Sequence, residues 1–233
     1  MKIKISVILL FLAGILSAQE NYMSISFGTG TPLGDFSNTS SLATDGYAAQ
    51  GFMAEYSFGY YPIDYLGAGG SVKFIQNGVY KDELSDALLA LLPDNPGVII
   101  ENPVFDVGLW RIVAIGVGPQ LSLPTGKFCF DLHFYPGMHI VMPPQMALTA
   151  IVDEQPTKYS LDSQSLRFGF ETGFAIQFKM SESASLRLSS SYLQTSAKGE
   201  IKSKVSEGTE NTEVEVTSKI QLINVGIGIA YRL

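Results

Sequence analysis

Five charged residues carry most of the chemistry that this sequence could support, because each lies in the middle third of a segment whose residue types alternate. In each segment the charge lies on the face opposite the bulky apolar side chains. An unpaired buried charge costs several kcal/mol, so we expect these groups to pair. We interpret them as an interior ion-pair network that holds strand register, with a path for protons or small ions as the alternative. The residues are Glu55, Lys73, Asp131, Glu171 and Arg187.

A second set of residues has the types needed for acyl transfer or ester hydrolysis. A serine nucleophile needs a base within hydrogen-bond reach, and His139, Ser163 and Asp162 are weak candidates for base, nucleophile and acid. No Gly-x-Ser-x-Gly turn, phosphate loop or metal-ligand cluster accompanies them. The single cysteine, Cys129, excludes an internal disulfide and a cysteine-based zinc site. We therefore predict a protein that is not an enzyme and holds no metal or cofactor.

Strands must position these residues, because a period of two dominates the chain. In the clearest case, bulky apolar residues such as Phe168, Phe170 and Phe174 alternate with Arg167, Glu171 and small residues. A helix would mix these two sets on each face. The pattern predicts eight strands, around residues 22–28, 51–60, 66–74, 113–121, 127–138, 166–179, 186–192 and 223–233.

The connections between these segments alternate between short and long. Short ones, near 61–64, 123–126 and 180–183, contain the Pro, Gly or small polar residues that suit tight turns. Long ones cover about 31–46, 77–103, 142–164 and 195–216. This order predicts an antiparallel up-and-down meander that closes on itself, with both ends of the chain on the short-turn side.

The two faces of the strands decide between a soluble barrel and a membrane barrel. One face is rich in bulky aromatic residues, whereas the other carries Gly, Ala, Ser and the charges. Small residues and charges make a poor water-excluding core but a good narrow lumen, and apolar-out with polar-in is typical of outer-membrane barrels. We therefore predict an all-β fold, an eight-stranded antiparallel up-and-down transmembrane β-barrel.

The beginning of the chain has the pattern of a secretory signal. Lys2 and Lys4 precede an apolar run from Val7 to Leu16, which is too short to span a bilayer, and small residues follow. We expect a cleaved signal peptide at 1–18 and a barrel at 19–233. The net charge of −7 and the lack of surplus Lys and Arg argue against a nucleic-acid partner.

Two long connections have features of their own. Residues 81–92 have the apolar spacing of a short amphipathic helix, with Asp82 as a possible cap and Leu84, Leu88, Leu91 and Leu92 on one side. In the last connection, valines alternate with polar residues, so we expect the final hairpin to extend beyond the bilayer. Pro143 and Pro144 limit regular structure in the third connection.

Several short motifs, in order, resemble the outer-membrane β-barrel domain family, including its PorT-like members. They are Gly30 to Phe36 after the first strand, Gly46 to Ala48 before the second, Val117 to Phe128 across the middle turn, and the ending Gly226 to Leu233. The resemblance covers nearly all of 19–233. One departure is Leu233 at the C-terminus, where many such barrels end on Phe.

These observations together lead us to expect a small protein of the cell outer membrane, exported through the secretory pathway. The expected role is structural or interactive and is carried by long extracellular loops. The alternatives are a narrow ion or small-solute channel and a lipid A-modifying hydrolase or acyltransferase. The expected partners are outer-membrane lipid and lipopolysaccharide, the barrel-assembly machinery during insertion, and a protein or ligand at the loops.

Overall fold

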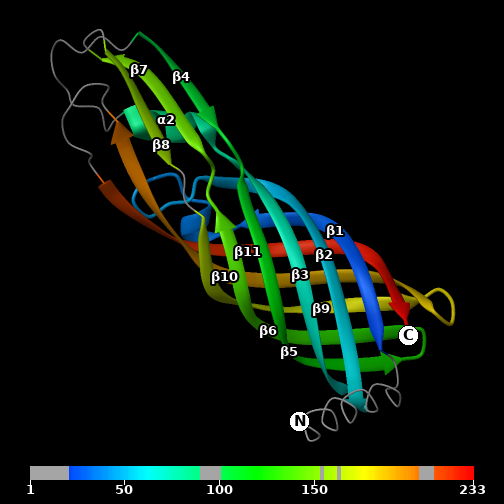
Figure 1. Cartoon of the computed structure of the whole chain (residues 1–233). Coiled ribbons are helices and arrows are strands. Elements are labelled where there is room, and N and C mark those ends of the chain that lie inside the picture. Colours follow the sequence, from blue (N-terminus) through cyan, green and yellow to red (C-terminus); the bar gives the residue numbers. More distant parts are fainter. Residues whose placement is uncertain (1–20, 90–100, 153–154, 162–163, 205–212) are drawn as a thin grey trace, which may run out of the picture.

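Eight strands form a barrel in this computed structural model, which describes residues 21–89, 101–152, 155–161, 164–204 and 213–233 (Figure 1). The expected signal peptide at 1–18 lies outside these residues. The barrel strands are β1 (Tyr22–Pro32), β2 (Ala48–Ile63), β3 (Leu66–Val79), β5 (Trp110–Thr125), β6 (Phe128–Met142), β9 (Ser165–Lys179), β10 (Ala184–Lys204) and β11 (Glu213–Arg232).

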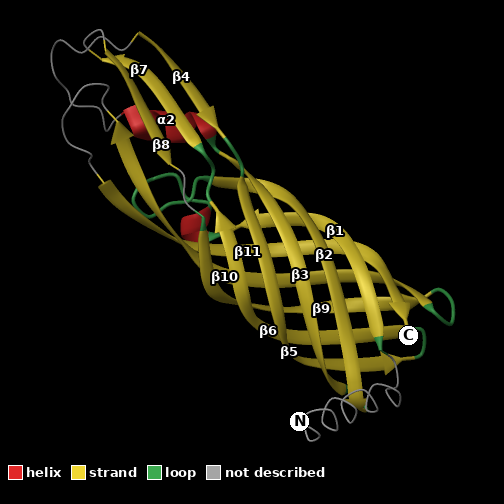
Figure 2. Ribbon diagram, in the orientation of Figure 1, coloured by secondary structure: helices red, strands yellow, loops and turns green. Residues whose placement is uncertain are grey.

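The barrel closes because the first and last strands pair. Each strand is antiparallel to its neighbours in the order β1-β2-β3-β5-β6-β9-β10-β11, and β11 returns to β1 from Tyr22↔Arg232 to Pro32↔Leu222. Closure satisfies the backbone hydrogen bonds of every strand in the ring, as a bilayer requires. The predicted eight-stranded up-and-down barrel is confirmed. The pairing of Tyr22 with Arg232 places the start of the first strand beside the end of the last strand (Figure 2).

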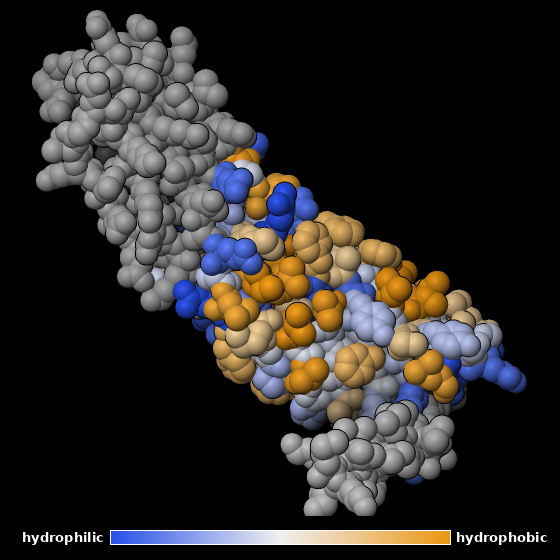
Figure 3. Space-filling view, viewed as in Figure 1, coloured by the Kyte–Doolittle hydropathy of each residue, from blue (hydrophilic) through white to orange (hydrophobic). Residues whose placement is uncertain are grey.

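The outer surface of the barrel is apolar over a broad belt (Figure 3). Phe27 is 54% exposed, Ile115 47% and Phe174 51%, whereas their strand neighbours point inward. So many exposed apolar side chains in a continuous band would be unfavourable in water and match the hydrocarbon layer of a membrane. The assignment of apolar residues to the outside is confirmed, and the barrel is a transmembrane one.

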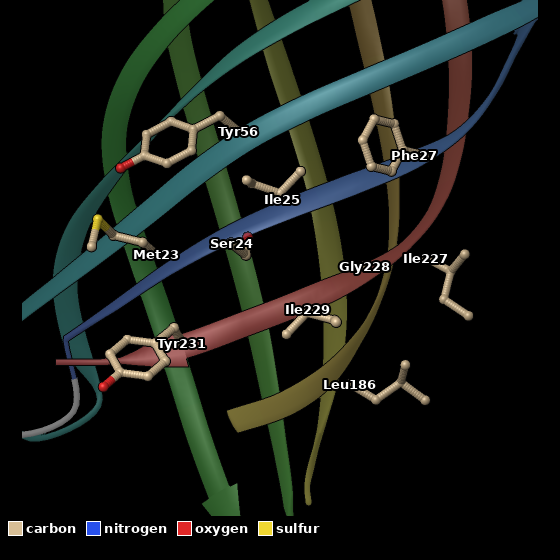
Figure 4. A pocket seen from close by; sticks show the side chains of 10 residues that line it. All are labelled: Met23, Ser24, Ile25, Phe27, Tyr56, Leu186, Ile227, Gly228, Ile229 and Tyr231. Atoms are coloured by element: carbon tan, nitrogen blue, oxygen red, sulfur yellow. The ribbon is translucent and has the colours of Figure 1, made fainter. Parts of the chain in front are cut away.

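The seam between β1 and β11 is part of this belt and forms an open apolar groove (Figure 4). Small residues of the two paired strands, Gly228 and Ser24, lie at its floor. Its walls are outward-facing side chains of β1, β2, β10 and β11: Met23, Ile25, Phe27, Tyr56, Leu186, Ile227, Ile229 and Tyr231. The groove therefore belongs to the lipid-facing surface.

Three further strands stand above the long-loop end of the barrel: β4 (Glu101–Val107), β7 (Met146–Val152) and β8 (Gln155–Leu161). β4 pairs with β7, β7 with β8, and β8 with the end of β10, from Ile201↔Leu161 to Lys204↔Lys158. We call β4, β7, β8 and the projecting ends of β10 and β11 the extension sheet (Figure 1). The sequence predicted long loops at 77–103 and 142–164, and this was wrong where β4, β7 and β8 form.

The last hairpin is longer than a bilayer crossing needs, as predicted. β10 has 21 residues and β11 has 20, compared with roughly 9–11 for a membrane-spanning strand. The two strands stay paired up to Lys202↔Glu213. They therefore run without interruption from the barrel into the extension sheet.

The expected helix in the second connection is present as α2 (Lys81–Leu89). Asp82 lies in its first turn and does not precede it, so the predicted cap was wrong by position. Leu84 is buried against Tyr47 and Val107, which attaches the helix to the chain just before β2 and at the end of β4. Leu91 and Leu92 lie outside the described residues. No helix among the described residues is long and apolar enough to cross a membrane.

Candidate functional site

Lys73 lies at the centre of a group of ion pairs inside the barrel. Its Nζ is 2.8 Å from Oε1 of Glu171 and 3.4 Å from Oε2 of Glu55, and it also donates to Oγ of Ser191 at 2.8 Å. Glu55 is opposite Lys73 on the adjacent strand, whereas Glu171 reaches it from β9, across the lumen. All three charged residues are buried. The contact between β3 and β9 therefore crosses the interior of the barrel.

Arg187 and Asp131 form a second buried pair nearer the short turns. Nη1 of Arg187 is 2.5 Å from Oδ2 of Asp131, and its guanidinium carbon lies 4.9 Å from the centre of the Tyr22 ring. Asp131 also accepts hydrogen bonds from Gln177 at 2.7 Å and Ser122 at 2.8 Å. The carboxylate thus has a cation and two neutral donors, which offset the cost of removing it from water.

A layer of aromatic and amide groups joins the ion pairs of Lys73 to the Arg187–Asp131 pair. Gln120 donates to the Tyr22 hydroxyl at 2.7 Å and accepts from the Tyr135 hydroxyl at 2.6 Å. The His133 ring stacks on Tyr135 with centroids 4.5 Å apart, and its Nε2 is 3.1 Å from Oε1 of Glu171. Gly69 leaves the space for this layer, since a Cβ there would collide with Gln120 and Tyr135. We call the two ion pairs of Lys73, the Arg187–Asp131 pair and this layer the polar lumen.

The structure therefore brings all five of the charged residues singled out in the sequence into the polar lumen. Two of the residues that connect them, Tyr22 and Gln120, were not among the candidates selected from the sequence. Both residues occupy inward-facing positions of alternating strands and carry a hydrogen-bonding group. This is a weak indication of a site, because many Ser and Gly residues also occupy inward-facing positions.

The half of the lumen nearer the extension sheet contains a large apolar cluster, beside buried polar residues that include Asn77, His139 and Asn224. Ile75, Ile112 and Leu193 are fully buried there, and each points inward from a different strand. Phe36, Ala48, Met53, Trp110, Ala114, Val141, Ala197, Ile220 and Leu222 complete the cluster, which we call the apolar lumen. The alternation along the chain did not predict this cluster, although consecutive apolar residues such as Phe74-Ile75 and Ile112-Val113 mark positions where both faces of a strand are apolar.

The mouth of the barrel is closed by the connection after β1. That connection contains the short 3-10 helix η2 (Gly34–Phe36), whose Phe36 is fully buried and meets Trp110 edge to face at 5.1 Å. Nε1 of Trp110 donates to the carbonyl oxygen of Gly46 at 2.9 Å. A Cβ at Gly46 would lie 2.6 Å from the Phe36 ring, so only glycine permits this packing. The loop is thereby held across the opening.

The weak catalytic candidates do not come together among the described residues. His139 is 1% exposed and faces the lumen, where it pairs in register with Ala114 and Arg167. Its ring packs over Gly169, and no described residue hydrogen-bonds its Nδ1. Ser163 and Asp162 lie outside the described residues. Within the described part of the chain, no group of three His, Cys, Asp or Glu residues could hold a metal ion.

Comparison with known proteins gives likeness only to solved structures. No family model matches the chain, and no curated protein matches it in sequence. The attachment invasion locus protein Ail of Yersinia pestis is 12% identical, with 92% of this chain and 98% of that chain covered and a TM-score of 0.46. A major outer membrane protein from Thermus thermophilus is 10% identical, covering 92% and 100%, with a TM-score of 0.48.

A third similar structure is Neisserial surface protein A, at 15% identity with 93% and 99% covered and a TM-score of 0.42. At these identities the likeness concerns the fold alone. Membership in the PorT-like group, which the sequence motifs suggested, stays a prediction.

Proposed function

We propose that this chain is an integral outer-membrane protein that does not conduct and that acts through the structures above its rim. The observation that carries this proposal is the filled interior of the barrel. An eight-stranded barrel is only wide enough for its own side chains, and here those side chains form three successive layers. They are the polar lumen, the apolar lumen and the loop with Phe36.

Each layer opposes the passage of ions for a different reason. The contact of Lys73 with Glu171 crosses the lumen and holds both charges in place. The apolar lumen leaves only a few buried polar side chains, such as Asn77 and Asn224, to replace the hydration shell of an ion, so entry would cost much of the desolvation energy of the charge. Phe36 and Trp110 cover the mouth. These features support a structural role for the interior rather than a channel.

The extension sheet and α2 are the parts available to a partner in the extracellular space. Five strand segments form the sheet, and its outermost strand β4 pairs only with β7 among the described residues. Such an arrangement suits the binding of a protein or other ligand at the cell surface. On this proposal the signal at 1–18 directs export, the barrel-assembly machinery inserts the strands, and lipid and lipopolysaccharide contact the apolar belt.

Fractionation and conductance test the proposal together. We expect the protein in the outer-membrane fraction, as a band whose electrophoretic mobility changes on boiling, because a closed barrel resists detergent until it is heated. In planar bilayers we expect current at the background level. A soluble protein without a heat-dependent shift would contradict the membrane placement, and steady conductance well above background would favour the narrow channel instead.

We assign no catalytic activity to the barrel. The burial of His139, the candidate base, supports this assignment. An enzyme acting on a lipid needs its base at a surface that the lipid can reach. We expect lipid A from cells expressing the wild-type chain and from cells expressing His139→Ala to have identical mass spectra. A lipid A modification that disappears with His139→Ala would show instead that the lipid-modifying alternative is right.

A further inference from the structure

A small pocket opens on the outer side of the barrel, where β5 and β6 meet the extension sheet. It has a volume of 180 Å³ and is lined by Leu109, Arg111, Met142, Pro143, Gln145 and Gln164. At the share of about 30 Å³ that a molecule takes in liquid water, this is the room of a few waters. It can admit one compact polar group but not a lipid chain.

Arg111 is the charged group of this pocket. It is exposed, and its neighbours Trp110 and Ile112 are buried, so the alternation of β5 points the guanidinium outward. It stands opposite Met142 on β6 and Gln76 on β3, at the upper end of the strands. No carboxylate among the residues that the structure describes forms an ion pair with it. The site therefore presents an exposed cation at the edge of the membrane belt.

The surface directly below the pocket is strongly apolar. Leu166 on β9 is 61% exposed and Phe168 70% exposed, and Met138 on β6 is 44% exposed. Met138 and Phe168 are paired in register across β6 and β9. Met142 of the pocket is the last residue of β6, and Gln164 directly precedes β9. The polar pocket therefore continues downward into the lipid-facing wall that these two strands form. A ligand that fits both surfaces has an anionic head and apolar chains.

We propose that this pocket binds the phosphate group of an outer-leaflet lipid, with its acyl chains lying along the wall of Met138, Leu166 and Phe168. Guanidinium groups bind phosphate through two parallel N–H···O bonds, and such charge-assisted bonds are about twice as strong as neutral ones. The side-chain amides of Gln145 and Gln164 supply further donors at the rim of the pocket. This inference rests on the outer-membrane placement proposed above.

Native mass spectrometry of the refolded full chain in detergent tests this, with three probes. Dipalmitoyl phosphatidic acid carries chains and phosphate, dipalmitoylglycerol carries the same chains without phosphate, and inorganic phosphate carries no chains. We expect phosphatidic acid to bind best, and Arg111→Gln to weaken it about tenfold, the effect of losing one strong charged contact. Lys219→Gln is the matched control, because Lys219 is also exposed but lies on β11 outside the pocket.

Several results would overturn the inference. Equal binding of dipalmitoylglycerol would show that the chains alone are recognised, and equal binding of inorganic phosphate would show that the ligand is not a lipid. Equal losses in Arg111→Gln and Lys219→Gln would indicate only a general effect of charge. The heat-dependent mobility shift, measured on each variant, separates these results from a failure of that variant to form the barrel. Absence of the shift in the wild-type chain would contradict the proposed function itself.

Discussion

The two halves of the lumen fill the same barrel in opposite ways. The polar lumen uses few groups in fixed directions, such as the Arg187–Asp131 pair at 2.5 Å. The apolar lumen uses side chains such as Ile75, Ile112 and Leu193, which contact one another without directional bonds. A directional network discriminates between strand registers, because a shift of one residue would turn each charge toward lipid. An apolar cluster excludes water but tolerates small rearrangements.

The strongest way to break the polar lumen is to remove its central cation. Lys73→Met leaves Glu55 and Glu171 buried near each other without a counter-charge, so we expect a loss of about 4 kcal/mol of unfolding free energy. Urea unfolding of the barrel in lipid vesicles measures this. The double variant Lys73→Met/Glu171→Gln restores part of the balance and should be more stable than Lys73→Met alone. If the double variant is the less stable, the ion pairing does not account for the loss.

In the apolar lumen the largest effect should come from a cavity. Ile112→Ala removes three carbon atoms from a fully buried position, and we expect a loss of about 3 kcal/mol. The same unfolding measurement applies, with Ile115→Ala as the control, because Ile115 points outward on the same strand and is 47% exposed. Equal losses in the two variants would mean that the inner cluster contributes no more than the lipid-facing surface.

A smaller effect is expected from Glu171→Gln, which keeps the shape of the side chain but removes its charge. Lys73 retains Glu55 at 3.4 Å and the Ser191 hydroxyl, so we expect a loss of about 2 kcal/mol, typical of a hydrogen bond to a charged group. The thermal midpoint of the heat-dependent mobility shift should fall accordingly. An unchanged thermal midpoint would show that the charge of Glu171 does not contribute to the stability of the barrel.

The smallest expected effect is that of Tyr135→Phe, which deletes one hydroxyl from the layer that joins the ion pairs of Lys73 to the Arg187–Asp131 pair. The Gln120 oxygen loses a donor at 2.6 Å, and we expect about 1 kcal/mol from this neutral bond. The ring and its stacking on His133 are retained. A loss as large as that of Lys73→Met would show that the layer couples these ion pairs, so that they act as one unit.

The polar lumen was predictable from the sequence because each of its charges interrupts an alternating segment. Glu171 stands between Gly169 and Gly173 on one face, Asp131 shares its face with Cys129 and His133, and a buried charge needs a partner. The apolar lumen was not predictable in this way. Ile75 and Ile112 lie where both faces of a strand are apolar, and the alternation with a period of two then disappears. Which strands contribute to each pair depends on register, and one sequence does not specify register between strands that are distant in the chain.

The extension sheet shows the same limit more strongly. The long β10–β11 hairpin was predicted because its alternation continues beyond the bilayer. β4, β7 and β8 have 7 residues each, and two of their three pairings join different connections of the chain. Short strands with distant partners leave little local pattern. Contact with neighbouring strands, more than local preference, decides whether they form.

The continuity of β10 and β11 has a mechanical consequence. These two strands carry the extension sheet on unbroken ladders, whereas on the other side the connections at 108–109 and 143–145 interrupt the strand path between sheet and barrel. A force applied to a ligand held by the sheet would therefore pass into the membrane mainly through one hairpin. Pulling at the surface would then load the two ladders that join this hairpin to the ring, β9–β10 and β1–β11, before the other strand pairs.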